Sequence, residues 1–211
     1  MKIQSQNPAK NYESVVEIDY DLSQVENAVQ AAEKALPAWR ALDMAERITA
    51  LRALEAAFKN HEEEMARIIT LEMGKVWSES IFEAKNLTAR VELTITEALK
   101  RVETEYPAGV AGETRYHSQG VMAVLGPYNF PAHLMNSHII PALMTGNTIV
   151  AKPSEVCPGV GQLYAQCFEE AGFPTGVFNL VQGRGDVGKA LAIHPKVRGV
   201  LFTGSYATGR A

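Results

Sequence analysis

The feature that most constrains the fold is a regular alternation of short apolar runs and helical stretches in the second half of the chain. The apolar runs are GVMAVL (120–125), NTIVAK (147–152), GVFNLVQ (176–182) and VRGVLFT (197–203). Stretches of helical character lie between them, near 132–145, 158–171 and 186–193. Short, doubly apolar strands that alternate with helices are typical of a parallel sheet covered on both faces. The pattern therefore predicts a doubly wound α/β domain.

The first half of the chain has a helical pattern instead. Ser23 and Glu26 stand three residues apart ahead of an apolar stripe, which predicts a capping box at a helix start. Asp43 and Glu46 repeat this arrangement before the next helical stretch. A third stretch ends at Gly74, the residue type that most often closes a helix.

A long helical pattern follows, from about 78 to 102, and gives way to a glycine- and proline-containing segment. This segment, 106–119, reads as an exposed strand or hairpin arm, and a solvated loop explains it equally well. We therefore divide the chain into an N-terminal helical part (1–105), a candidate arm (106–119) and an α/β core (120–211) that is expected to be incomplete.

Composition excludes several classes of protein. The 211 residues are 46% hydrophobic and 21% charged, which allows a buried core, and the net charge of −4 argues against nucleic-acid or anionic-membrane partners. The N-terminus lacks the apolar core of a signal peptide, and the most apolar run is interrupted by Pro141 and Gly146. Cys157 and Cys167 suggest neither a disulfide framework nor a metal cluster. We expect a cytoplasmic protein.

Polar, glycine-rich segments follow each predicted strand. They are GPYNFP (126–131), KPSE (152–155), GRGDVG (183–188) and GSYATG (204–209). Because ligands of doubly wound sheets bind beyond the carboxyl ends of the strands, these four segments together predict a ligand site. Asn129 in the first segment either settles its own turn or directs an N–H at a ligand.

The third segment fits the G-x-G-x-x-G dinucleotide fingerprint through Gly183 and Gly188. The fingerprint expects an acid about 20 residues further on, yet no Asp or Glu follows Asp186. A glycine-rich turn therefore explains this segment equally well. Lys152 and Glu155 in KPSE are able to supply the missing ribose contact, although an exposed ion pair at a helix start is the simpler interpretation.

The fourth segment places Ser205 at a helix start, where backbone N–H groups favour an anion such as pyrophosphate. A plain serine N-cap explains this segment as well.

Taken together, the segments resemble the aldehyde dehydrogenase family. GPYNFP resembles its Gly-Pro-aromatic-Asn-Phe-Pro signature, PALMTGNTIVAKPSE its linking segment, and FTGS (202–205) a further signature, all in the family's order. The resemblance implies an NAD(P)-binding domain, of which 1–105 would be the helical part and 120–211 the core, a catalytic domain and an oligomerisation arm. A homodimer or homotetramer built with the 106–119 arm is expected.

The resemblance also implies a mechanism. A cysteine thiolate attacks an aldehyde, hydride passes to the nicotinamide, and a glutamate-activated water hydrolyses the thioester to the acid. Asn129 matches the amide that donates to the oxyanion, and Lys152 and Glu155 match the adenosine-ribose contacts. Glu155 favours NAD over NADP, because a carboxylate repels a 2′-phosphate. The other implied cofactor-binding residues are Pro127, Tyr128, Ser154, Gly183, Gly188, Gly204, Ser205, Thr208 and Gly209.

The residues that would complete this chemistry are not recognisable in the chain. Cys167 falls on an apolar helical stripe, and Cys157 lies near the adenosine end of the expected site. His133 and His138 are five residues apart and read as surface or packing residues. The chain therefore resembles the N-terminal part of the enzyme, and we expect it to be inactive on its own.

Tyr128, where tryptophan is commoner, and FPAHLMNSHIIPALMTGN (130–147) resemble the succinylglutamate-semialdehyde dehydrogenase branch, which serves arginine catabolism. That branch implies N-succinylglutamate 5-semialdehyde as the substrate. Two alternatives remain: another aldehyde dehydrogenase, including a CoA-acylating one, or a non-catalytic nucleotide-binding module.

Overall fold

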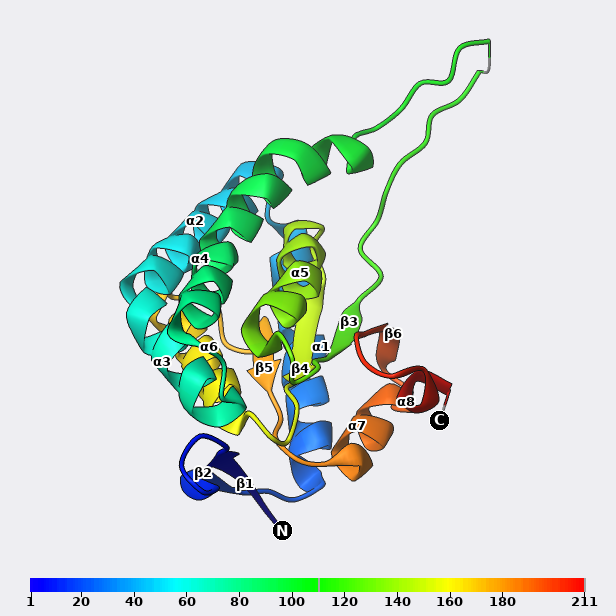
Figure 1. Ribbon diagram of the computed structural model, residues 1–211. Coiled ribbons are helices and arrows are strands. Elements are labelled where there is room, and N and C mark those ends of the chain that lie inside the picture. Colours follow the sequence, from blue (N-terminus) through cyan, green and yellow to red (C-terminus); the bar gives the residue numbers. More distant parts are fainter. Residues whose placement is uncertain (110, 211) are drawn as a thin grey trace.

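The computed structural model describes residues 1–109 and 111–210, and it has a parallel sheet between layers of helices (Figure 1). The chain begins with a two-stranded antiparallel sheet, β1 (Lys2–Asn7) and β2 (Glu13–Asp19). Four helices follow, namely α1 (Ser23–Ala41), α2 (Met44–Asn60), α3 (Glu62–Met73) and α4 (Trp77–Leu93). The α/β part then runs through β3 (Val121–Leu125), α5 (Pro131–Met144), β4 (Thr148–Lys152), α6 (Pro158–Glu170), β5 (Phe178–Leu180), α7 (Gly185–Ala192), β6 (Val197–Phe202) and α8 (Tyr206–Arg210).

The main sheet has the strand order β5-β4-β3-β6, and every neighbouring pair is parallel. In the central pair the last residue of β3, Leu125, lies opposite Lys152, the last residue of β4. On its other side Leu125 lies opposite Phe202 of β6. The strands therefore end together at one edge, as the alternating pattern predicted.

Helices cover both faces of this sheet, which confirms the predicted α/β class. Val121, Ala123 and Val150 pack in a cluster with α1 and α7. Val124 and Ile149 point to the other face, where they pack in the larger core with α5 and α6. The strands are apolar on both faces because each face has its own helical layer.

An outer layer of α2, α3 and α4 lies against α5 and α6 (Figure 1). The predicted capping box of α2 is confirmed: Asp43 accepts from the Glu46 N–H at 2.8 Å, and Glu46 accepts in return at 2.7 Å. Gly74 closes α3 in the left-handed conformation, with φ of 68°.

The capping box predicted at Ser23 and Glu26 is wrong. Ser23 is already the first residue of α1, and both its N–H and its hydroxyl donate to Asp21. Glu26 instead accepts from Gln30 and pairs with His194 of the segment after α7. A serine inside the helix cannot adopt the extended backbone that an N-cap requires.

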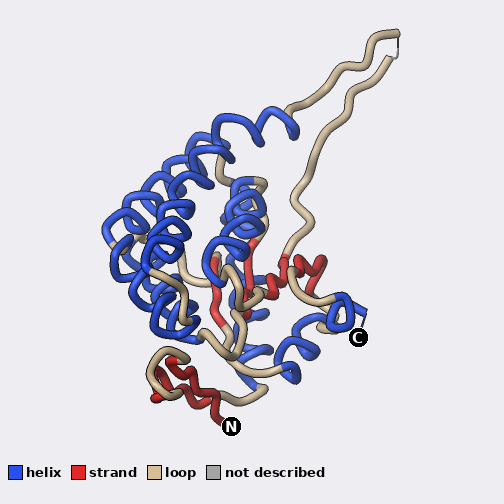
Figure 2. The backbone as a smooth tube through the Cα atoms, in the orientation of Figure 1, coloured by secondary structure: helices blue, strands red, loops and turns tan. Residues whose placement is uncertain are grey.

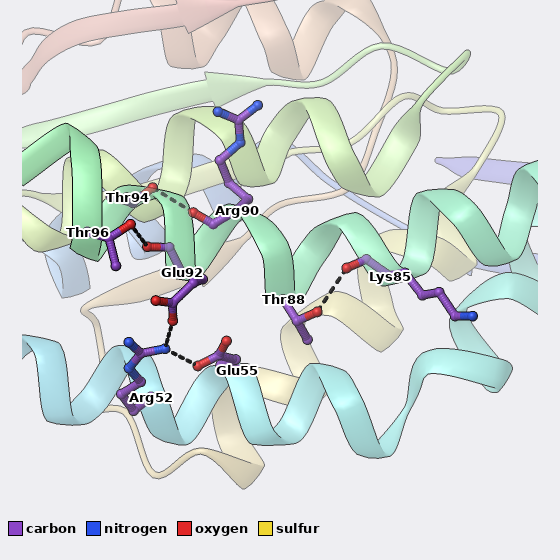
Figure 3. A network of polar contacts seen from close by, with 8 residues as sticks. All are labelled: Arg52, Glu55, Lys85, Thr88, Arg90, Glu92, Thr94 and Thr96. Carbon is purple, nitrogen blue, oxygen red and sulfur yellow. Dashed lines mark hydrogen bonds and ion pairs between the residues drawn. The ribbon is translucent and has the colours of Figure 1, made fainter.

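The long helix predicted for 78–102 changes its winding near its end. After α4 the chain continues as a π-helical turn, Thr94–Ala98, and a 3₁₀ turn, Leu99–Val102. Figure 3 shows the Thr94 and Thr96 hydroxyls donating to the carbonyls of Arg90 and Glu92, at 2.8 and 3.0 Å. Such bonds compete with the helical ladder and bend it.

The same view shows how α4 is tied to α2: the Arg52 guanidinium contacts Glu55 on its own helix and Glu92 on α4 (Figure 3). Beyond the 3₁₀ turn the chain runs out and back as a long arm that projects from the body (Figure 2). This arm contains the predicted segment 106–119, of which residue 110 lies outside the described residues. An antiparallel bridge between Glu105 and Thr114 joins its two limbs.

Candidate functional site

The four predicted segments begin where β3, β4, β5 and β6 end, so the parallel register brings them to the same edge of the sheet. Adjacent strands are hydrogen-bonded there as far as the turns: the Gly126 N–H donates to the Lys152 carbonyl at 2.9 Å. The Thr203 N–H in turn donates to the Leu125 carbonyl at 3.3 Å. This edge is where a doubly wound sheet binds its ligand.

Asn129 lies in the turn between β3 and α5 and is exposed to solvent. Within the described residues its side-chain amide makes no hydrogen bond, so it does not settle its own turn. Of its neighbours, Tyr128 is 59% exposed and Phe130 38% exposed, whereas Pro127 is buried. The amide is therefore available to a ligand.

Two of the helix starts at this edge are already occupied by carboxylates of the protein. Glu83 of α4 accepts from the N–H groups of Ala132 and His133 at the start of α5. Glu72 of α3 accepts from the N–H groups at the start of α6, at 2.9 Å each. Sequence reasoning missed both acids, because their partners lie 49 to 88 residues away. Burial raises the pKa of Glu72.

Lys152 is buried, and its ammonium is directed inward. Nζ donates to the carbonyls of Pro153 at 2.8 Å and Gly183 at 2.7 Å, which ties the end of β4 to the glycine-rich loop. Burial lowers the pKa of Lys152, and nearby carboxylates partly oppose this. Two of its three N–H groups are thus used on backbone, and one remains for a ligand.

Glu155 lies 3.8 Å from the Lys152 ammonium and its side chain is 45% exposed. It lines a surface cavity of about 210 Å³ with Ile3, Val156 and Arg184. Ser154, one residue earlier, is buried and its carbonyl accepts from the Cys157 N–H. Sequence reasoning missed Arg184, which places a cation on the same cavity as the carboxylate.

The glycine-rich loop packs tightly beside this cavity. Gly183 has φ of 148°, and a Cβ there would lie 2.4 Å from Val187 and 2.8 Å from the Tyr20 ring. A Cβ at Gly188 would only touch the Lys152 side chain, at 3.4 Å. The first glycine is therefore required by backbone and packing, while the second keeps α7 close to the lysine.

The turn after β6 is built from small residues and hydroxyls. Ser205 Oγ accepts from the Thr208 N–H at 3.1 Å, which is the serine N-cap allowed by the sequence. The Phe202 ring lies against Gly204 and Gly209, so that a Cβ at Gly204 would come within 2.4 Å of it. Ser205, Gly204, Thr208 and Gly209 are exposed at this edge.

Neither cysteine is a suitable nucleophile. Both are buried, and burial raises the pKa of the Cys167 thiol to about 12 and that of Cys157 further. Cys167 packs in the main core, as predicted. The two histidines predicted as surface or packing residues lie on α5. His138 contacts the Thr203 hydroxyl at 2.9 Å, and burial lowers its pKa. His133 also has a pKa lowered by burial.

Over the described residues, no helix combines the length and apolar character needed to cross a bilayer. The chain is 45% identical over 189 residues to an N-succinylglutamate 5-semialdehyde dehydrogenase of Pseudomonas fluorescens, covering 89% of this chain and 39% of that protein. It is 43% identical to the Burkholderia thailandensis protein of the same name, covering 97% of this chain and 42% of the relative.

The chain thus spans about two fifths of the length of these curated relatives. Among solved structures, one described as an E. coli NADP dependent enzyme superposes with a TM-score of 0.91 at 36% identity. That match covers 100% of this chain and 44% of the solved one. The sequence model of the aldehyde dehydrogenase family matches residues 1–211, and the chain belongs to that family.

Proposed function

We propose that this chain is the cofactor-binding portion of an NAD-dependent aldehyde dehydrogenase that oxidises N-succinylglutamate 5-semialdehyde to N-succinylglutamate. The observation that carries the proposal is the meeting of four strand-end segments at one edge, with a half-exposed carboxylate at Glu155 and an Asn129 amide that makes no hydrogen bond among the described residues. The substrate is taken from the names of the two curated relatives. The residue at 128, a tyrosine, agrees with that branch.

The residues at this edge fit a dinucleotide. Glu155 lines the surface cavity and would accept from ribose hydroxyls there, and the remaining Lys152 N–H would assist. The exposed Ser205 turn, rather than the carboxylate-capped starts of α5 and α6, is left for a pyrophosphate. A bound NAD supplies the hydride acceptor of the reaction. Pro127 and Tyr128 would flank its nicotinamide half, and Ser154, Gly183 and Gly188 would line its adenosine half.

Asn129 would act on the substrate. When a thiolate adds to the aldehyde carbon, the carbonyl oxygen gains negative charge, and an amide N–H held nearby stabilises it. Asn129 lies in a turn fixed at both ends by β3 and α5, so the donor is positioned before the charge develops. The thiolate would come from outside the 211 residues, because Cys157 and Cys167 are buried and resist ionisation.

The decisive experiment is Asn129→Ala in the natural polypeptide that carries this chain. Loss of one oxyanion donor should lower kcat by about 10²–10³-fold and leave nucleotide affinity nearly unchanged. Asn60→Ala, at an exposed position on α2, is the matched control. An unchanged kcat in an assay limited by chemistry would remove Asn129 from the mechanism. The 211-residue chain alone should bind NAD but form no NADH with the aldehyde.

Cofactor preference is tested at Glu155. A carboxylate disfavours the 2′-phosphate of NADP, and Arg184 on the same cavity partly offsets this. Glu155→Gln should therefore raise affinity for NADP relative to NAD by about tenfold, a change of about 1.4 kcal/mol. Glu169→Gln, at an exposed position on α6, should leave the ratio of the two dissociation constants unchanged.

The arm suggests how the protein assembles. It projects from the body, and Tyr106 and Tyr116 on it are 74% and 49% exposed. We propose that 106–119 pairs with a second copy of the protein. Deleting this segment should lower the mass measured by light scattering, and an unchanged mass would contradict the assignment.

A further inference from the structure

Glu83 is a fully buried carboxylate whose contacts all lead toward the Asn129 turn. It stands on α4 with no solvent exposure. Its Oε1 accepts from the N–H groups of Ala132 at 3.0 Å and His133 at 3.2 Å. These N–H groups belong to the first turn of α5, which begins two residues after Asn129. Glu83 therefore fixes the point at which the turn enters the helix.

Lys75 completes this arrangement from the segment between α3 and α4. Its ammonium lies 2.6 Å from Glu83 Oε2 and 3.7 Å from the centre of the Phe130 ring, and its side chain is only 13% exposed. Phe130 is the residue directly after Asn129. A cation over the face of an aromatic ring is attracted to it. One ammonium thus joins the carboxylate that caps α5 to the ring next to Asn129.

Comparison with Glu72 indicates that this lysine is not needed for capping. Glu72 is also buried, and it caps α6 through two N–H groups at 2.9 Å. In the part of the chain that the structure describes, Glu72 makes no ion pair. The same capping task is therefore performed without a cation. Lys75 also contacts the Phe130 ring. Capping of α5 does not require this contact, so the contact needs another explanation.

We propose that Lys75 and Glu83 are positioning residues that hold the Phe130 ring and, through it, the Asn129 amide in the geometry for oxyanion stabilisation. This inference rests on the proposed function of Asn129. The physical basis is that a displacement of about 1 Å at a reacting centre can cost roughly 10²-fold in rate. β3 and α5 fix the ends of the turn, but Asn129 itself is exposed and its side chain makes no hydrogen bond within the described residues, so contacts to the adjacent Phe130 bear on where the amide lies.

The experiment uses Lys75→Met in the natural polypeptide, with Lys75→Arg as the conservative variant. The methionine should lower kcat by about tenfold or more while the KM for NAD changes little, and the arginine, which also pairs with carboxylates and stacks on rings, should restore most of it. Because Lys75→Met strands a buried charge, the combination Lys75→Met/Glu83→Gln is tested beside it.

Two controls separate positioning from stability. Val91→Ala creates a cavity on α4 away from the pair, and it should lower the urea midpoint without changing kcat. Lys59→Met removes an exposed lysine of α2 that pairs with Glu62 of α3, and it should change neither the urea midpoint nor kcat. If Lys75→Met follows the Val91→Ala pattern, with kcat unchanged, the positioning role is wrong.

A double-mutant cycle with Asn129→Ala distinguishes failure of this inference from failure of the proposed function. If Lys75 acts through Asn129, Lys75→Met should lower kcat no further once the amide is gone. A normal additional loss would overturn the positioning role while leaving Asn129 in place. If the protein oxidises no aldehyde, the proposed function fails. NMR of the Asn129 side-chain amide then still tests placement: Lys75→Met should shift that resonance, Lys59→Met should not, and no shift would refute the inference.

Discussion

Gly183 offers the sharpest test of the tertiary structure, because alanine there meets two separate obstacles. Its φ of 148° lies in the region that L-residues avoid, which costs about 1–3 kcal/mol. The new Cβ would also lie 2.4 Å from Val187 and 2.8 Å from Tyr20, and overpacking of this kind costs about 1–3 kcal/mol more. We therefore expect Gly183→Ala to lower the free energy of unfolding by about 2–6 kcal/mol.

Two other glycines separate the two contributions. Gly172 has φ of 71° but nothing within 4 Å of its Cβ position, so alanine there should cost only the backbone part, about 1–2 kcal/mol. Gly185, two residues after Gly183 and the first residue of α7, has open space around its Cβ position and no left-handed backbone. Alanine at Gly185 should change stability by less than about 0.5 kcal/mol.

The assay is urea unfolding of the three variants and the parent chain, followed by circular dichroism and analysed with a common slope. The expected order of stability loss is Gly183→Ala, then Gly172→Ala, then Gly185→Ala. If Gly183→Ala and Gly185→Ala unfold at the same urea midpoint, Gly183 does not pack closely against Val187 of α7 and Tyr20, and the reasoning is refuted. If Gly172→Ala and Gly183→Ala lose the same free energy of unfolding, the steric contribution at Gly183 is absent.

Three further predictions concern buried groups. Cys157 and Cys167 should not react with Ellman's reagent in the folded chain at pH 8 and should release two equivalents in urea, because burial excludes the reagent and raises both pKa values; rapid labelling of the native chain would contradict this. Burial lowers the pKa of His138, so the unfolded chain takes up a proton at this residue first as the pH falls. The contribution of His138 to stability is therefore present above about pH 6.5 and is lost as pH falls through the folded pKa. His138→Gln should weaken the pH dependence of the urea midpoint between about pH 7.5 and 5. Trp39→Phe removes a 3.1 Å hydrogen bond to the Leu143 carbonyl from a site only 1% exposed, and should destabilise by about 1–3 kcal/mol in urea titrations.

The two capping boxes illustrate how far local sequence reasoning reaches. Asp43 and Glu46 form the predicted box because both partners lie within one turn and α2 begins where the pattern begins. Ser23 does not form the predicted capping box, because α1 begins at Ser23 itself, one residue earlier than predicted, and the Ser23 N–H donates to Asp21. The N-terminal hairpin of β1 and β2 carried no recognisable signal, since KIQSQN has few apolar residues.

At the candidate site, the sequence predicted which segments meet at the edge of the sheet, but not which hydrogen bonds their side chains make. Lys152 was expected to face a ligand, whereas in the fold its ammonium donates to the backbone carbonyls of Pro153 and Gly183. Arg184 gave no signal, because only the packing of its loop against β1 and the Glu155 turn places it on the shared cavity.

The sequence by itself determined the alternation of strands and helices, and with it the edge of the sheet where GPYNFP and its three counterparts meet. These features are encoded locally, in apolar periodicity and in the glycines and prolines that end each strand. The tertiary structure decided which groups at that edge remain available. Buried carboxylates from α3 and α4 satisfy the starts of α6 and α5, whereas the Asn129 amide makes no hydrogen bond with any residue that the structure describes. That outcome depends on pairings across 49 to 88 residues, which no local pattern specifies.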